Sequence, residues 1–576
     1  MKNKYKNVLL CVIWLLAVVA CAPPKPEPSA GSEKWWKEAI VYQIYPRSFK
    51  DSDGDGVGDL KGIISRLDYL KSLGIDVVWI NPIYQSPNYD NGYDISDYRA
   101  IQPEFGTMDD FDQLLDGLHQ RNIKLVMDLV VNHSSHEHAW FRQSRSSRTN
   151  PYRTYYHWWP AEKGKPNPRF SFFDVAGDAW QYDSASDAYY LHYFADQQPD
   201  LNWENPRVRQ EVHDIMRFWA DKGIDGFRLD AFQYAAKDTT FPALPEGYEK
   251  NIAKYYGMKP QIHDYLREMN TEVFRAYDVM TVAEGAGSSF ADAHALVDED
   301  RQELNMAYHF DAIDIGKEKG SYDLVDFKRV FSRWDSAFAQ DGWLALYLAN
   351  HDNARMVSRF GNDSEAFRAV SSKMLTTFLM TMRGTPFYYF GDELGMANIR
   401  FERIEDYQDI ETRNKYAKAK QEGANLDAFI ETQKRIARDN GRTPFQWDGT
   451  AQGGFTTGTP WLAVNPNYRQ INAAAQESDP RSVLHFFRAA VQLRKQNTAL
   501  VYGSYALLDP SHLAIYAYTR TYQNQVWAVV LNFSDQPVRW QSPIDLTRAT
   551  VRLNNYSEHE TGSYQPYQAV VYQLSK

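Results

Sequence analysis

The sequence predicts an α/β fold in which eight β-strands alternate with helices and close into a (β/α)8 barrel. Three observations support it. Eight extended apolar runs recur along the chain, with amphipathic stretches between them, and such alternation builds a parallel sheet that closes into a TIM barrel. After the third run the rhythm stops, and aromatic residues, Gly, Pro and Asp take over. From residue 505 the pattern changes to short alternating strands, which predicts a C-terminal antiparallel β domain.

The predicted barrel strands are short apolar runs, several of them rich in β-branched and aromatic residues, as strands favour. They span residues 39–45, 75–80, 123–131, 224–229, 279–283, 304–310, 344–349 and 385–390. The helices predicted between them are amphipathic. They span residues 60–73, 109–121, 206–222, 261–277, 324–339 and 365–382, and the last barrel helix spans 483–495.

The interruption from residue 134 to 203 is too long for a structureless loop inside a compact domain. It predicts a subdomain inserted after the third strand, so that the barrel occupies residues 35–133 and 204–504. A second irregular stretch, at residues 397–465, follows the eighth strand. The C-terminal domain occupies residues 505–576, with strands expected at 514–519, 526–531 and 569–574.

The first residues are predicted to be a targeting segment. Lysines precede an apolar run at residues 8–20, which is short for a bilayer span of ~20 residues. The run ends at Cys21 in a sequence, Val-Val-Ala-Cys, that resembles a bacterial lipobox. We therefore expect a lipoprotein signal peptide at residues 1–21 and a Pro-rich tether at 22–34. The alternative is an ordinary secretory signal with a chance cysteine.

Lipidation of Cys21 implies an exported protein anchored to a membrane. Ala22 rather than Asp follows the cysteine, which favours the periplasmic side of a Gram-negative outer membrane. The only other cysteine, Cys11, lies in the removed segment, so no disulfide is expected in the mature chain. A net charge of -11 disfavours nucleic acid as a partner. The sequence does not indicate an oligomeric state.

Carboxylates and histidines follow four of the predicted strands. His133 follows the third strand, Asp230 the fourth and Glu284 the fifth, while His351 and Asp352 follow the seventh. One such acid could be a helix N-cap, but capping does not account for the whole set. The C-terminal ends of barrel strands carry the catalytic groups of such enzymes. A retaining glycosidase needs two carboxyl groups ~5–5.5 Å apart, so this face is suited to breaking a glycosidic bond.

With these strand ends and four further motifs, the chain resembles glycoside hydrolase family 13, the α-amylase superfamily. It is most similar to the branch of oligo-1,6-glucosidases and α-glucosidases. The further motifs are VYQIYPRSF (41–49), DNGYDISDY (90–98), QPDLNWENP (198–206) and RDNGRTPFQW (438–447). The resemblance implies a retaining, exo-acting α-glucosidase. Such an enzyme releases glucose from the non-reducing ends of short α-1,4- or α-1,6-linked glucooligosaccharides, through a covalent β-glucosyl-enzyme.

The resemblance also implies a role for each acid. Asp230 corresponds to the nucleophile, Glu284 to the acid/base, and Asp352 to the acid that holds the sugar 2- and 3-hydroxyls. Arg228 lies two residues before Asp230 on the same strand face, where its charge favours the ionised carboxylate. Glu284 has to start protonated near neutral pH, which requires a raised pKa.

The remaining implied residues bind the sugar. His133 and His351 would donate hydrogen bonds to it, and Tyr93 would stack beneath it. Asp90 and Arg438 match the pair that holds the non-reducing-end 4-hydroxyl, and such a pair would close the pocket to the middle of a chain. The alternatives are metal binding or core packing for the histidines, and a surface ion pair of little energetic value for Asp90 and Arg438.

The loop at residues 51–59 carries four closely spaced aspartates among glycines. Hard oxygen ligands at this density suit Ca²⁺ better than Mg²⁺. An EF-hand does not fit, because Gly62 occupies the position of its bidentate glutamate. The resemblance implies one structural Ca²⁺, bound by Asp51, Asp53, Asp55, Asp59 and the carbonyl of Val57. The alternative is a solvated acidic turn, and no organic cofactor is expected.

Two positions depart from the isomaltose-cleaving pattern. Ala231 follows the expected nucleophile where such enzymes typically carry Val, and a smaller residue favours α-1,4 bonds or broad tolerance. Glycines at 285 and 287 stand where relatives are bulkier, which leaves linkage preference open. One alternative function is a transglucosylase or sugar isomerase on the same fold, of the sucrose isomerase or trehalose synthase type. Another is an inactive relative acting as an interaction protein, which the three intact acids disfavour.

Overall fold

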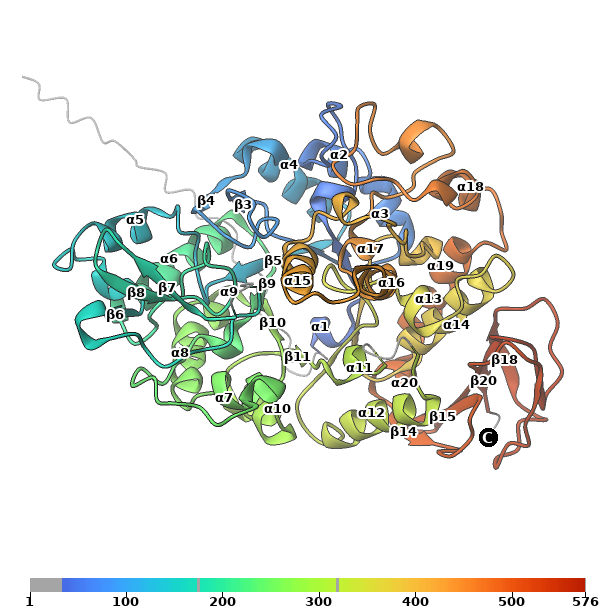
Figure 1. The fold of residues 1–576 in the computed structure, drawn as a ribbon. Helices are drawn as coiled ribbons and strands as arrows, with labels where there is room; N and C mark the ends of the chain where they lie inside the picture. The colour runs from blue at the N-terminus through green and yellow to red at the C-terminus, as the bar shows by residue number, and fades with distance from the viewer. Residues whose placement is uncertain (1–33, 174–176, 317–320, 575–576) are drawn as a thin grey trace, which may run out of the picture.

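The computed structural model describes residues 34–173, 177–316 and 321–574, and its centre is an eight-stranded parallel sheet (Figure 1). The strand order is β11-β10-β9-β5-β2-β1-β13-β12, and an isolated parallel bridge between Ala307 and Leu344 links the two edges. The predicted (β/α)8 barrel is therefore confirmed. Its strands are β1 (Val41–Ile44), β2 (Val77–Ile80), β5 (Lys124–Val130), β9 (Gly226–Asp230), β10 (Met280–Glu284), β11 (Met306–Tyr308), β12 (Ala345–Leu346) and β13 (Thr385–Tyr389).

The barrel strands are buried on both faces, which is why they read as continuous apolar runs rather than as alternating ones. All residues of β1, β2, β9 and β13 are buried. Each strand lies where the sequence predicts it, although most are shorter than predicted. Their common direction places all their C-terminal ends on one face of the barrel.

Helices surround the barrel, and their ends follow local sequence rules. α6 (Pro206–Lys222) begins with the Asn205 cap and a proline in the first turn, and it ends at Gly223 in the left-handed region. α19 (Val483–Lys495) also has the predicted bounds. The other helices of the barrel and its loops are α1 (Trp35–Glu38), α4 (Met108–His119), α7 (Ile252–Tyr256), α10 (Phe290–Val297), α11 (Asp311–Asp314), α12 (Leu324–Ala337), α13 (Met356–Phe360), α14 (Arg368–Thr381), α18 (Ala473–Glu477) and α20 (Thr498–Tyr502).

Two predicted helices are interrupted. The first is divided at Ser65 and Arg66 into α2 (Leu60–Ile64) and α3 (Leu67–Leu73). The second consists of α8 (Gln261–Met269), one π-helical turn (Asn270–Phe274) and α9 (Arg275–Tyr277). A π-turn keeps the chain helical, so the apolar periodicity alone does not reveal it.

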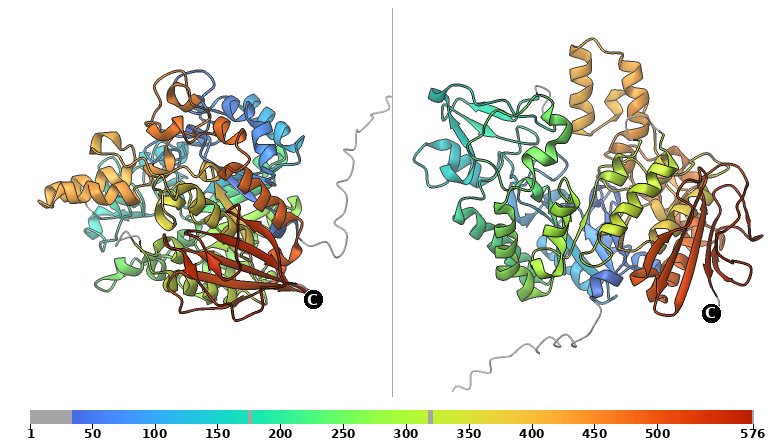
Figure 2. Two further views of the ribbon diagram at one scale, coloured as in Figure 1. Left: turned by 90° about the vertical axis from the view of Figure 1, so that its right-hand side faces the viewer. Right: turned by 90° about the horizontal axis from the view of Figure 1, so that it is seen from below.

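The segment after β5 forms a small subdomain beside the barrel (Figure 2). It contains α5 (Ala139–Ser146) and a three-stranded antiparallel sheet of β6 (Trp158–Pro160), β8 (Ala188–Leu191) and β7 (Trp180–Asp183). An isolated bridge between His133 and Asp200 joins the two ends of the insertion at the top of the barrel. A short hairpin of β3 (Tyr84–Gln85) and β4 (Asp97–Ile101) lies after β2.

The stretch at residues 397–465 is not irregular throughout, which corrects the sequence prediction. It contains two paired helices, α15 (Ile410–Gln421) and α16 (Leu426–Ile436), followed by α17 (Asp439–Arg442). Figure 2 shows α15 and α16 projecting from the barrel near the inserted subdomain. α15 buries only Thr412, so it has no apolar stripe that would have identified it as a helix.

The C-terminal domain is a five-stranded antiparallel sheet in the order β14-β15-β16-β20-β18. Its strands are β14 (Ser504–Leu507), β15 (Ile515–Tyr522), β16 (Gln525–Asn532), β18 (Thr550–Asn554) and β20 (Ala569–Gln573), beside a small pair of β17 (Val538–Arg539) and β19 (Ser563–Tyr564). Within the described residues, no helix has the length and apolar character needed to cross a bilayer. Cys21, the predicted lipidation site, lies outside the described residues.

Candidate active site

A small pocket of about 70 Å³ lies at the C-terminal ends of the barrel strands. Eight of the predicted site residues line it: Asp90, Tyr93, His133, Asp230, Glu284, His351, Asp352 and Arg438. Phe173 and Phe194 of the inserted subdomain and Ala231 complete the lining. The ninth residue, Arg228, does not line the pocket but is fully buried next to two of its carboxylates. The fold thus brings together residues that are far apart in the sequence.

Arg228 holds the two central carboxylates next to each other. Its Nη1 donates to Asp230 Oδ1 at 2.5 Å, and its Nη2 lies 2.6 Å from Glu284 Oε1. The same Nη1 also donates to Asp128 Oδ1 at 2.7 Å. The other oxygen of Glu284 accepts the backbone N–H of Ala231 at 2.8 Å. Because one planar guanidinium binds both carboxylates, they face the same small space.

Burial raises the pKa of both carboxyl groups, although Arg228 opposes the rise in each case. The pKa of Glu284 is raised to about 8, and the negative charges of Asp230 and Asp352 add to the effect. The pKa of Asp230 is raised to about 7. Glu284 therefore keeps its proton to a higher pH than Asp230. This order is what an acid paired with a nucleophile requires.

Asp352 has the opposite electrostatic environment. Burial would raise the pKa of its carboxyl, but His351, Arg438 and Arg442 outweigh burial and hold that pKa below its ordinary value. Arg438 Nη1 and Arg442 Nη2 both donate to Asp352 Oδ1, at 3.1 and 3.0 Å. The sequence prediction missed Arg442, although it lies in the quoted RDNGRTPFQW motif. Asp352 is thus a permanently ionised hydrogen-bond acceptor.

His351 is a neutral donor in this arrangement. Burial lowers its pKa to about 3. Nδ1 lies 2.9 Å from Gln43 Nε2, which donates to it, so the single ring proton is on Nε2. Nε2 lies 2.7 Å from the Tyr93 hydroxyl and 3.1 Å from Asp352 Oδ2. Tyr93 stacks on His351 at 5.2 Å, and its hydroxyl donates to Asp128.

His133 differs from the expectation of a free hydrogen-bond donor. Burial lowers its pKa to about 3, so the ring is neutral and carries one N–H. Nε2 lies 3.1 Å from the carbonyl oxygen of Tyr93, and Asn132 donates to Nδ1 at 3.2 Å. The one N–H of His133 is therefore already bound to the protein.

The pocket lining contains the expected pair of Asp90 and Arg438. Both are buried, and Arg438 Nη2 donates to Asp90 Oδ1 at 3.4 Å. Burial raises the pKa of Asp90 to about 6 against the attraction of Arg438. Gln198 donates to Asp90 Oδ2 at 3.2 Å, and Asp409 binds Arg438 from the other side. Because both members are buried, the surface ion-pair interpretation does not apply.

The residues that depart from the family pattern have clear local roles. Ala231 adopts a left-handed conformation with φ of 46°, which is strained for a residue with a side chain and aims its N–H at Glu284. Gly285 has φ of 84°, and a Cβ there would lie 2.5 Å from the amide of Gln233. Gln233 is buried, so its side chain occupies the space that the glycine leaves. At Gly285 the small residue therefore leaves no open space, because Gln233 fills it.

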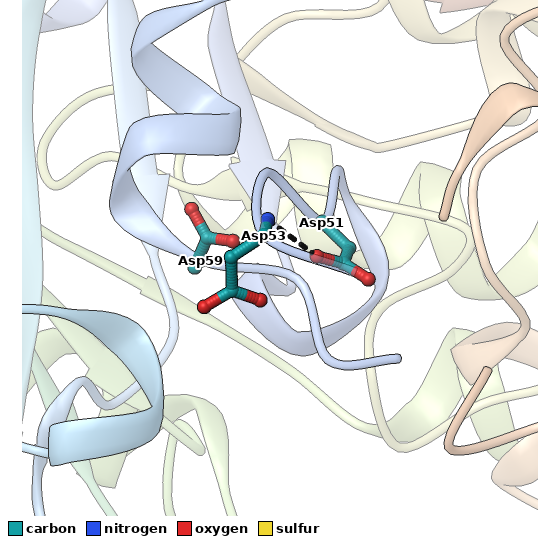
Figure 3. A group of neighbouring side chains, drawn as sticks. All are labelled: Asp51, Asp53 and Asp59. Carbon is teal, nitrogen blue, oxygen red and sulfur yellow. Dashed lines mark hydrogen bonds between the residues drawn. The ribbon is translucent and has the colours of Figure 1, made fainter. Parts of the chain in front are cut away.

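The acidic loop gathers three of its four aspartates. Ligand oxygens of Asp51, Asp53 and Asp59 lie within 4.8 Å of one another, and Asp55 is not among them (Figure 3). Burial and the neighbouring carboxylates raise the pKa of Asp55. Backbone N–H groups of the loop donate to Asp51, as does the hydroxyl of Thr456. The crowded carboxylates fit a hard divalent cation bound at a rigid loop.

The chain is similar to known proteins over nearly its whole length. Residues 43–503 match the α-amylase catalytic domain, and residues 505–568 match the maltogenic amylase C-terminal domain. An oligo-1,6-glucosidase from Parageobacillus thermoglucosidasius is 48% identical over 561 residues, covering 94% of this chain and 99% of that protein. An α-glucosidase from Pediococcus pentosaceus is 44% identical, covering 95% of this chain and all of that protein.

Solved structures agree with these matches. An isomaltulose synthase mutant from Erwinia rhapontici NX5, in complex with sucrose, superimposes with a TM-score of 0.92. It is 45% identical, and the match covers 94% of this chain and 100% of that one. The barrel, the strand-end carboxylates and the match to the catalytic domain lead to one conclusion: the chain belongs to the α-amylase family of glycoside hydrolases.

Proposed function

We propose that the protein is a retaining, exo-acting α-glucosidase, which releases glucose from the non-reducing ends of short α-linked glucooligosaccharides. The observation that carries the proposal is that one guanidinium, of Arg228, binds both Asp230 and Glu284. A retaining mechanism needs two adjacent carboxyl groups whose pKa values differ, so that one is ionised while the other is protonated.

In this mechanism Asp230 attacks the anomeric carbon while Glu284 protonates the leaving oxygen. Arg228 then faces a newly neutral ester and an ionised Glu284, which it stabilises from the same position. Glu284 next takes a proton from water, and the water oxygen attacks the anomeric carbon and releases Asp230. Asp352 stays ionised throughout, and its Oδ2, which lies 3.1 Å from His351 Nε2, can accept a hydrogen bond from a sugar hydroxyl.

The proposed exo action rests on four residues that line the pocket together with the three acids: Asp90, Arg438, Phe173 and Phe194. In the proposed pose they would lie opposite the leaving group. A chain that continued beyond the reacting glucose would meet a buried ion pair. A space of about 70 Å³ also favours one terminal sugar over the middle of a chain.

A sugar isomerase is the second candidate, because the match to an isomaltulose synthase is as extensive as the match to the glucosidases. Both activities share the glucosyl-enzyme and differ in what intercepts it. The test is to incubate the protein with maltose, isomaltose, sucrose and trehalose, and to quantify products by chromatography. Free glucose from maltose or isomaltose supports hydrolysis. Isomeric disaccharides from sucrose, with little free glucose, would favour the isomerase instead.

We further propose that the loop at residues 51–59 binds one structural Ca²⁺. Asp51, Asp53 and Asp59, whose oxygens lie close together, would supply carboxylate oxygens. The family resemblance adds Asp55 and the carbonyl of Val57, which would complete the set when the cation binds. The cation would neutralise crowded charge and fix the loop against the segment near Thr456. It would take no part in the reaction, because the loop contributes no residue to the pocket.

We also propose that Cys21 is lipidated, which would anchor the enzyme at the periplasmic side of an outer membrane. The lipobox-like sequence before Cys21 and the Pro-rich tether after it support this proposal. Labelled palmitate should be incorporated into the native chain and not into Cys21→Ser. Equal recovery of both forms in the soluble fraction would contradict it.

A further inference from the structure

We propose that Asp409, at the start of α15, is a positioning residue that fixes the orientation of Arg438 and thereby controls recognition of the chain end. The inference deepens the proposed function and rests on it, since the sugar that Arg438 would recognise is a terminal glucose. Asp409 does not line the pocket and acts only through Arg438.

The contacts of Arg438 are divided between two sides. Its Nε and Nη2 both donate to Asp409 Oδ1, at 2.8 and 2.5 Å. The contacts on the pocket side are longer, at 3.1 Å to Asp352 and 3.4 Å to Asp90. A guanidinium has five N–H donors in a fixed plane. By binding the Nε edge, Asp409 directs the remaining N–H groups toward the pocket carboxylates.

Asp409 is itself held rigidly. It is 1% exposed, and its Oδ2 accepts the backbone N–H and the hydroxyl of Thr412 as the N-cap of α15. In return, Asp439, the neighbour of Arg438, accepts the backbone N–H groups of Gln408 and Asp409 at 2.6 and 2.9 Å. The two segments therefore bind each other in both directions. The Asp409 carboxylate binds the Arg438 guanidinium, and the Asp439 carboxylate binds the backbone N–H groups of Gln408 and Asp409.

The helix pair is attached to the pocket at further points. Asn440 Nδ2 donates to the carbonyl of Gln433 in α16 at 3.0 Å. Asn414 of α15 donates to the carbonyl of Phe173 at 2.6 Å. The Phe173 ring lines the pocket and lies 5.0 Å from the Arg438 guanidinium carbon. The base of the pair thus forms a support behind Arg438, although its tip projects into solvent (Figure 2).

Loss of the Asp409 charge should move the Arg438 guanidinium in a defined direction. Without the charge of Asp409, Arg438 keeps its pocket-side carboxylates and a longer contact, of 3.7 Å, with Glu411 of α15. The shorter contact then draws it toward Asp352, the acid expected to hold the sugar 2- and 3-hydroxyls. The Arg438–Asp90 hydrogen bond then weakens further. It is already the longest of those that Arg438 makes to Asp90, Asp352 and Asp409. Because this contact is the one matched to the 4-hydroxyl, discrimination at that position should fall.

The test compares Asp409→Asn with Asn425→Ala. Asparagine preserves the N-cap of α15 and removes the charge, whereas Asn425→Ala removes the N-cap of α16 and does not touch Arg438. The assay measures kcat and KM with nitrophenyl α-glucoside and with its 4-epimer, the α-galactoside. For Asp409→Asn we expect KM for the glucoside to rise about tenfold with kcat within about threefold, because ground-state binding is lost. The preference for glucoside over galactoside should fall as well.

Asn425→Ala should leave KM, kcat and the glucoside preference unchanged, even if its melting temperature is lower. An Asp409→Asn enzyme with the same kinetic pattern as Asn425→Ala would overturn the inference. If Asp409→Asn does not fold, Asp409→Ser also preserves the cap and makes the same prediction.

Crystal structures of the native and variant proteins separate this inference from the proposed function. An Arg438 guanidinium that keeps its native position in Asp409→Asn would refute positioning, whatever the enzyme's substrate is. A displaced guanidinium, in a protein whose native form releases no glucose from any α-glucoside, would support positioning and refute the proposed function.

Discussion

Replacement of Glu284 by Gln is the perturbation whose outcome the structure defines most closely. Burial raises the pKa of Glu284 to about 8. At pH 7 a carboxyl group with the ordinary pKa of 4.5 would be protonated in about one molecule in 300, whereas a pKa of about 8 protonates about nine in ten. The environment therefore raises the fraction of acid-competent enzyme by about 300-fold.

The sign of the pH dependence follows from the two raised pKa values. Glu284 must be protonated, so kcat/KM should fall as pH rises through about 8. Asp230 must be ionised, so kcat/KM should fall as pH decreases through about 7. The two groups interact through Arg228, so the apparent values belong to the pair. The result is a narrow bell-shaped profile.

The assay measures kcat/KM from pH 5 to pH 10 with maltose and with nitrophenyl α-glucoside. Glu284→Gln should lower turnover of maltose by about 10²–10⁴-fold, the usual contribution of a general acid. The nitrophenyl substrate should lose far less in the glycosylation step, because nitrophenolate leaves without a proton. The basic limb should also disappear with that substrate. Equal losses on both substrates, or an unchanged basic limb, would refute the acid role.

Three further predictions follow from the site. Asp230→Ala should lower turnover by at least about 10³-fold while the melting temperature stays near the native value, and residual activity within tenfold of native would contradict its role as nucleophile. Ala231→Val should shift the isomaltose-to-maltose ratio of kcat/KM toward isomaltose by roughly tenfold, because a methyl-sized change in a pocket has that effect; an unchanged ratio counts against this. Excess chelator should lower the melting temperature of protein purified with Ca²⁺, restored by added Ca²⁺. A melting curve that chelator does not alter would mean that the acidic loop binds no stabilising cation.

The barrel could be predicted because its strands are buried on both faces and its acids follow strand ends. The run that forms β9, for example, ends at Asp230. Both the buried strand and the acid at its end can be recognised from neighbouring residues in the sequence. The helix pair of α15 and α16 could not be found in that way, since α15 is charged on nearly every side. Its N-cap residues, Asp409 and Asn425, were the available signals, but caps alone do not distinguish a helix from a turn.

The site was predicted less completely than the fold because its supporting contacts are non-local. Asp128 lies in the strand predicted at residues 123–131, yet only the folded barrel places it against Arg228. Likewise, Asp409 meets Arg438 only because the fold brings the N-caps of α15 and α17 together. Gln233 fills the space beside Gly285, which no pattern of residue sizes would reveal. Tertiary packing determines these contacts, and a single sequence does not indicate which distant residues will meet.

The central claim is that Asp230 and Glu284 act on opposite sides of one anomeric carbon. Mass spectrometry after reaction with a 5-fluoro-α-glucosyl fluoride tests it most directly, because the fluorine slows release of the covalent intermediate. We predict one glucosyl adduct, located on the peptide that contains Asp230 and absent from Asp230→Ala. An adduct on another residue would contradict the mechanism. So would inactivation of the enzyme by this reagent without any covalent adduct.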